Sequence, residues 1–114
     1  MSITQIVILA GGKGTRLAQN TPLPKPLASV AGKPAILHQV QNAYDQGWRK
    51  FLFLLGYEAQ KVQDVLEDVK PSFEGAEFEY SIEPEPLGTA GALFHAWENL
   101  ESSFFLFYAD TVFS

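Results

Sequence analysis

Apolar residues along the chain form four short runs that predict β-strands. The runs Ile3–Ala10, Phe51–Leu55 and Phe104–Ala109 are almost continuously aliphatic or aromatic, which is typical of parallel strands covered on both faces. Residues Phe78–Ile82 instead alternate between apolar and polar side chains and predict a half-exposed strand.

Three segments between these runs carry apolar residues at helical spacing and predict helices at Pro34–Gly47, Glu58–Val69 and Thr89–Leu100. The first has proline in its first turn and glycine at its end, as helices commonly do. The order β-loop-α-β-α-β-α-β predicts an α/β fold with a Rossmann-like, mostly parallel sheet and flanking helices. A length of 114 residues suits one domain spanning residues 1–114.

In sheets of this class, ligands bind beyond the carboxyl ends of the strands. Four segments of the chain are expected there: the glycine-rich loop after Ala10, Gly56-Tyr57, Glu83–Gly88, and Asp110. The unusual residues of the sequence therefore fall on one edge of the predicted sheet.

Charge is distributed unevenly between the two parts of the chain. Residues 1–44 contain Lys13, Arg16, Lys25 and Lys33 and no acid, whereas residues 45–114 hold the other four cations and all thirteen acids. This asymmetry is either a chance clustering in a short chain or a sign that the first third of the chain faces a polyanion.

Composition excludes several other functions. The net charge of −5 argues against nucleic acid or a membrane surface as a partner. No apolar stretch reaches the length of a membrane span, and the N-terminus does not resemble a secretory signal. The chain has no cysteine, which excludes disulfides and thiolate metal sites and fits a cytoplasmic location.

The loop after the first strand has the chemistry of a phosphate site. Its glycines let backbone N–H groups approach an anion closely, Arg16 can bind phosphate through two donors, and Lys25 adds a charge on a segment stiffened by prolines. The loop matches neither the dinucleotide-binding pattern G-x-G-x-x-G nor the P-loop pattern.

Together, LAGGKGTRL, PKPL, VAGKPAI, EPEPLGTAGAL and the strand-terminal YAD resemble the signature of the sugar-phosphate nucleotidylyltransferases, or NDP-sugar pyrophosphorylases. The sequence EPEPLGTAGAL is most similar to the corresponding segment of guanylyltransferases that act on mannose 1-phosphate or a manno-heptose 1-phosphate. The resemblance covers the whole chain but only the N-terminal, nucleotide-binding part of the nucleotide-diphospho-sugar transferase fold. It thus implies a truncated fold, a fragment of a larger chain.

The resemblance implies transfer of a nucleotidyl group from a nucleoside triphosphate to a sugar 1-phosphate, with release of pyrophosphate. Arg16 and Lys25 are implied to be catalytic, because they would neutralise the pyrophosphate and hold the α-phosphate. The residues implied to bind the nucleotide are Leu9, Ala10, Gly11, Gly12, Gly14, Thr15, Glu85, Pro86, Leu87, Gly88 and Thr89.

The same resemblance implies Mg²⁺ as the cofactor, with Asp110 as one of its carboxylate ligands. Ala109 departs from the family, which commonly has Gly or Ser before this Asp. A carboxylate such as Glu85 suits the N1–H and N2 donors of guanine, which favours GTP over dTTP, UTP and CTP. The family's second metal-binding Asp and its sugar-binding residues lie beyond Ser114, so the sequence does not identify the sugar.

Several residues also have plain structural interpretations. Lys13 and Lys33 suit a solvated loop and a turn, His38 and His95 fall inside predicted helices without a metal partner, and Asp110 taken alone could be a helix cap. The two tryptophans, Trp48 and Trp97, are expected to pack in the core or at its edge.

Two other functions stay open at this point. The chain could be a non-catalytic domain that binds a nucleotide or nucleotide sugar, or an α/β interaction module whose loop binds nothing. Its partners besides substrate could be a second copy of the chain or the remainder of a larger polypeptide, because a truncated sheet would expose apolar surface.

Overall fold

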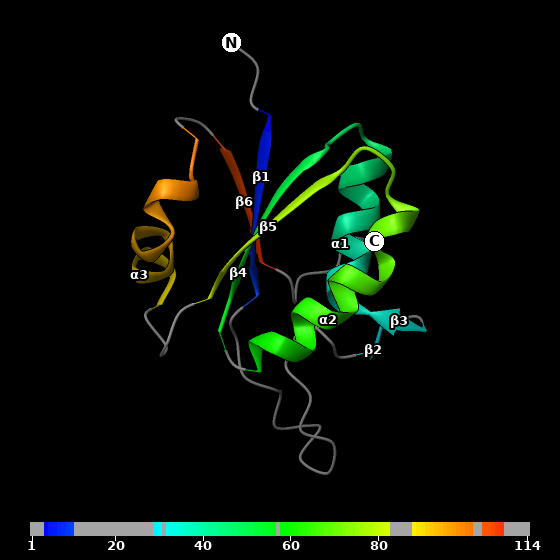
Figure 1. The fold of residues 1–114 in the computed structure, drawn as a ribbon, viewed down its shortest axis with the longest axis horizontal. Coiled ribbons are helices and arrows are strands. Elements are labelled where there is room, and N and C mark those ends of the chain that lie inside the picture. The colour runs from blue at the N-terminus through cyan, green and yellow to red at the C-terminus, as the bar shows by residue number, and fades with distance from the viewer. Residues whose placement is uncertain are drawn as a thin grey trace.

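A computed structural model describes residues 4–10, 29–30, 32–56, 58–82, 88–101 and 104–108 of the chain (Figure 1). Its centre is a four-stranded sheet in the order β5-β4-β1-β6. The strands are β1 (Gln5–Ala10), β4 (Lys50–Leu55), β5 (Glu77–Ile82) and β6 (Phe104–Tyr108). All the pairings in this sheet are parallel, which confirms the predicted fold class.

The helices lie on both faces of the sheet. Helices α1 (Ala35–Asp45) and α2 (Ala59–Val69) cover one face, and α3 (Gly88–His95) covers the other (Figure 1). A short 3₁₀ helix, η3 (Lys70–Ser72), follows α2 and contains Pro71, a residue that cannot continue the α-helix. Strands β1, β4 and β6 therefore contribute alternate side chains to two separate cores, whereas β5 contributes Phe78 and Tyr80 to the core under α1 and α2 alone.

The larger core lies between the sheet and helices α1 and α2. Phe51 and Phe53 of β4 are fully buried, and their rings meet Phe78 of β5 edge to face at centroid distances of 5.4 and 5.1 Å. Val62 and Leu66, one turn apart on α2, are also fully buried. The helical spacing that predicted α2 thus marks the face that packs on the sheet.

The smaller core lies under α3. It joins Val7 of β1 and Leu52 and Leu54 of β4 to Ala92 and Ala96, which lie four residues apart. Both alanines are almost completely buried. Their small side chains let the helix backbone come close to the sheet.

Helix α1 begins and ends as its sequence predicts. Pro34 is the N-cap, and Gly47 follows the last turn with a φ of 105°, a conformation that favours glycine. The Gly47 amide donates to the Tyr44 carbonyl at 3.0 Å. A small antiparallel ladder of β2 (Ser29–Val30) and β3 (Lys33–Pro34) precedes the helix and was not predicted, since two-residue strands show no periodicity.

The third helix is shorter than predicted. It ends at His95 instead of Leu100, and a 3₁₀ helix, η4 (Trp97–Asn99), follows. After the helix, the fully buried Gln5 side chain donates to the Asn99 carbonyl at 2.8 Å and accepts from the Glu101 amide at 3.0 Å. These contacts attach the segment that follows η4 to the first residue of β1.

Strand β6 is less buried than its apolar sequence predicts. Among the described strands it pairs with β1 alone, and 46% of Phe105 is exposed. Trp48 packs edge to face on Phe105 at 5.3 Å, as expected of a packing residue. Trp97, in contrast, is 69% exposed and belongs to neither core, so of the expected positions, core or edge, the core is excluded.

We predict that Gln5→Leu lowers the free energy of unfolding by about 2–4 kcal/mol, because the Asn99 carbonyl and the Glu101 amide lose their partner inside the protein. Urea denaturation followed by circular dichroism measures the change. The matched control is Gln60→Leu, which removes an exposed bond of 2.7 Å to Asp64 and should cost less than about 0.5 kcal/mol. Equal losses in the two variants would contradict this account.

Candidate functional site

The carboxyl ends of all four sheet strands lie at one edge of the fold. Because the strands are parallel, Ala10, Leu55, Ile82 and Tyr108 all end there. In Figure 1 this is the lower end of β1. The segments that the sequence singled out leave the sheet from this edge.

The connections reverse direction between β1 and β6. From β1 the chain moves to β4 and then β5 through helices on one face, and it then returns to the far side of β1 through α3 on the other face (Figure 1). In an open parallel sheet, such a switch point separates the helices of the two faces and leaves a crevice at the carboxyl ends of the strands. The switch point between β1 and β6 is therefore the candidate functional site.

Leu9 and Ala10 form the β1 side of this site. Leu9 lies opposite Leu54 on one side and Tyr108 on the other, and Ala10 lies opposite Leu55. Ala10 is 1% exposed, so the glycine loop begins from a residue held inside the core.

Gly88 and Thr89 lie in the first turn of α3, where the sequence placed them. The N-terminal end of this helix follows the carboxyl end of β5 after five residues. The other predicted site residues lie outside the described parts of the chain: Gly11, Gly12, Gly14, Thr15, Arg16, Lys25, Glu85, Pro86, Leu87 and Asp110.

Two features near this edge were not visible in the sequence pattern. Glu58, at the start of α2, has a left-handed backbone conformation with a φ of 53°. Its carboxylate forms an ion pair with the Lys61 ammonium at 2.8 Å. The ring Nε2 of His95 lies 3.1 Å from the carbonyl oxygen of Ile82, the last residue of β5. A histidine inside a predicted helix gives no sign of such a contact with another element.

The shifted pKa values in the described parts of the chain belong to structural contacts. At the amino edge of the sheet, a hydrogen-bonded ion pair with Glu101 raises the pKa of Lys50. The same pair, together with a hydrogen bond from Thr4 at 3.0 Å, lowers the pKa of Glu101. Burial and a hydrogen bond to Glu67 raise the pKa of the Tyr80 hydroxyl.

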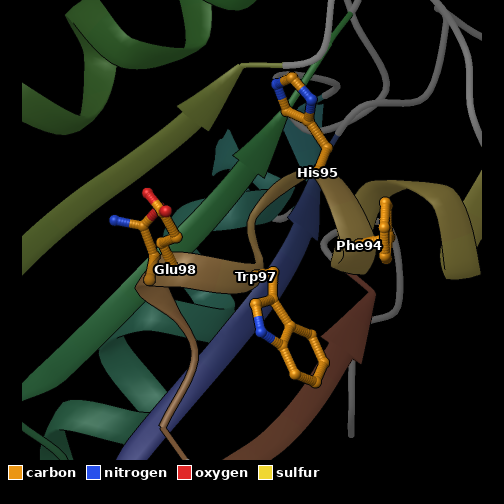
Figure 2. Close-up of a pocket in the computed structure, with 5 residues that line it drawn as sticks. Phe94, His95, Trp97 and Glu98 are labelled. Atoms are coloured by element: carbon orange, nitrogen blue, oxygen red, sulfur yellow. The ribbon is translucent and has the colours of Figure 1, made fainter.

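Apart from the switch point, the surface has an open depression of about 400 Å³ at the end of α3 (Figure 2). It is lined by Phe94, His95, Trp97, Glu98 and Asn99. Phe94 and Trp97 are 79% and 69% exposed, and His95 points away from Trp97. The lining has one carboxylate and neither lysine nor arginine, which does not suit a phosphate ligand.

Within the described residues, no three histidine, aspartate or glutamate side chains gather to hold a metal ion. The same residues include no helix that is long and apolar enough to cross a membrane.

Comparison with known proteins identifies the family of this chain. Residues 5–114 match the profile of the nucleotidyl transferase family. The chain belongs to this family. Its parallel sheet with flanking helices is thus that of a nucleotidyl transferase domain.

Similar curated proteins are mannose-1-phosphate guanylyltransferases. The catalytic subunit beta from Drosophila pseudoobscura pseudoobscura is 40% identical over 113 residues, which cover 96% of this chain and 30% of that protein. The enzyme from Saccharomyces cerevisiae is 34% identical over 110 residues, with 93% and 30% covered.

Solved structures show the same fold. HddC from Yersinia pseudotuberculosis complexed with GMP-PN is 34% identical, with a TM-score of 0.80, and the match covers 96% of this chain and 49% of that one. UDP-glucose pyrophosphorylase from Acinetobacter baumanii has a TM-score of 0.79 at 20% identity, with 97% and 47% covered, and supports the fold alone. The chain spans about half the length of these structures and less than a third of the curated relatives.

Proposed function

We propose that this chain binds a nucleoside triphosphate, GTP in preference to others, at the switch point between β1 and β6. It is the nucleotide-binding part of an enzyme that transfers the nucleotidyl group to a sugar 1-phosphate. The observation that carries the proposal is the position of two sequence features. Gly11 directly follows Ala10, and Asp110 follows Tyr108 by two residues, so both features flank the switch point.

The glycine loop binds the triphosphate through its backbone amides, at Gly11, Gly12 and Gly14. Arg16 offers two parallel donors to the phosphates that leave, and Lys25 holds the α-phosphate. An oxygen of the sugar 1-phosphate forms a bond to the α-phosphorus, and the bond from that phosphorus to the β-phosphate bridging oxygen breaks. Pyrophosphate leaves with the electron pair. The protein contributes position and positive charge to this step.

Asp110 supplies a carboxylate for Mg²⁺, a hard cation that prefers oxygen ligands. The donor type fits the ion, and the position beyond β6 brings it to the same edge as the glycine loop. When bound, Mg²⁺ supplies charge neutralisation to the phosphate oxygens. Within the chain, Asp110 holds one ligand position and Arg16 and Lys25 provide the remaining positive charge.

The base lies beside residues 85–89, at the start of α3. The Glu85 carboxylate accepts hydrogen bonds from N1–H and N2 of guanine, and uracil and thymine lack this pair of donors. The guanylyltransferase names of the similar curated proteins and the GMP-PN complex of HddC support GTP over the other nucleotides.

The first test measures binding of GTP, UTP, dTTP and CTP to the chain by calorimetry, with and without Mg²⁺. We expect GTP to bind at least tenfold more tightly than the others, and only weakly without Mg²⁺. Pyrophosphate release from GTP and mannose 1-phosphate, or a manno-heptose 1-phosphate, is measured in parallel. Tight binding of GTP without release would favour a non-catalytic nucleotide-binding domain, and no binding of any nucleotide would refute the proposal.

We predict that Arg16→Ala weakens GTP binding by about tenfold to a hundredfold, because hydrogen bonds to charged groups contribute about 1.5–3 kcal/mol each. The thermal unfolding of the protein without ligand should stay unchanged. Lys33→Ala is the matched control, since it removes a cation from β3 and should leave GTP affinity within twofold. A variant of Arg16 that binds GTP like the wild type would place the phosphates elsewhere.

We predict that Asp110→Asn removes most of the Mg²⁺ dependence of GTP binding, because an amide is a poor ligand for Mg²⁺ compared with a carboxylate. The measurement is a Mg²⁺ titration of GTP affinity in wild type and variant, in which the wild-type increase should shrink to less than threefold. Asp45→Asn, at the end of α1, is the control for loss of a carboxylate elsewhere. An unchanged titration in Asp110→Asn would show that the metal binds at other ligands.

A further inference from the structure

The contact between His95 and Ile82 joins two elements that flank the proposed base site. Ile82 is the last residue of β5, and His95 is the last residue of α3. The ring Nε2 lies 3.1 Å from the Ile82 carbonyl oxygen. Because a carbonyl oxygen can only accept, Nε2 carries the proton and donates. Figure 2 shows the His95 ring at the end of the helix, on the side opposite Trp97.

The other contacts of α3 with the sheet restrict its position less sharply. Ala92 and Leu93 of α3, and Ala96 directly after it, pack against Val7, Leu52 and Leu54. These contacts are apolar, and apolar contacts have no preferred direction. The hydrogen bond of His95 is directional and therefore restricts how the helix tilts and turns against β5.

The first turn of α3 is set by this contact through the stiffness of the helix. Gly88 lies seven residues from His95, a separation of about 10 Å along the axis. A tilt of about ten degrees at His95 displaces Gly88 by about 2 Å. A misplacement of about 1 Å in a binding site can reduce function by as much as a hundredfold.

We propose that His95 is a positioning residue for the nucleotide base: its hydrogen bond to the Ile82 carbonyl sets where the first turn of α3, Gly88 and Thr89, stands relative to the carboxyl edge of the sheet. This inference rests on the proposed function of that edge. It assigns His95 no contact with the nucleotide. The triphosphate, bound by the glycine loop after β1, is independent of the contact.

The test compares two ligands, GTP and inorganic tripolyphosphate, both with Mg²⁺, on the 114-residue chain. We expect His95→Ala to weaken GTP binding by about tenfold, which corresponds to about 1.4 kcal/mol. Binding of tripolyphosphate should stay within twofold of the wild type, because it has no base. A general loss of stability would weaken both ligands together.

Two variants serve as matched controls. In His95→Gln the side-chain amide nitrogen takes the place of Nε2 and can donate to Ile82, so GTP affinity should return to within threefold of the wild type. Phe94→Ala removes the exposed neighbouring side chain and should change neither ligand by more than twofold. If His95→Ala does not fold, His95→Leu keeps a similar volume without a donor and takes its place.

The outcomes separate this inference from the proposed function. Equal GTP affinity in wild type and His95→Ala, equal weakening of both ligands, or failure of His95→Gln to restore binding would each overturn the role of His95. A wild-type chain that binds neither ligand would overturn the proposed function and the inference with it.

Discussion

The central constraint in this fold is the double pairing of β1. This strand is hydrogen-bonded to β4 on one side and β6 on the other, and Ile6, Val7 and Ile8 are fully buried. Both faces of the strand are thus covered, and neither of its edges is free. Its last residue, Ala10, is 1% exposed and pairs with Leu55 of β4, so the glycine loop starts from a fixed point. A loop that binds an anion through backbone amides needs such a fixed origin, because otherwise ordering it would cost much of the binding free energy.

Strand β1 also links the amino edge of the sheet to its carboxyl edge. At the amino end, Gln5 bonds to the Asn99 carbonyl and the Glu101 amide, which precede β6 in the chain. The parallel pairing of β1 with β6 then extends from Gln5 and Phe104 to Leu9 and Tyr108. The carboxyl edge of the sheet is thus linked to the contacts of Gln5 at the opposite edge through the paired strands. A defect at Gln5 is expected to act on the carboxyl edge through strand position.

The sequence predicted those parts of the fold that depend on local pattern. Strand β4 and helix α2 were placed within two residues, because an unbroken apolar run and an i, i+3, i+4, i+7 repeat each have one common structural solution. The errors have a different cause. The end of α3 and the exposure of Trp97 and Phe105 depend on how distant segments pack, and the β2–β3 ladder is too short to show a periodicity. Gln5 and Asn99 are 94 positions apart, and no local pattern records such a pair.

The candidate site, like the fold, has a part that follows from local sequence and a part that does not. Its phosphate-binding chemistry could be proposed from sequence, since glycines, Arg16 and Lys25 follow one another in a single loop and act through backbone and charge. The position of α3 against β5, on which the proposed base site rests, could not be predicted. It involves apolar contacts of Ala92, Leu93 and Ala96, which leave no distinctive pattern, and a histidine that bonds to a main-chain carbonyl. Every residue has such a carbonyl, so the partner of His95 has no signature of its own. Residues that position a ligand through the backbone are thus the hardest to find from sequence, although their effect on affinity can equal that of a direct contact.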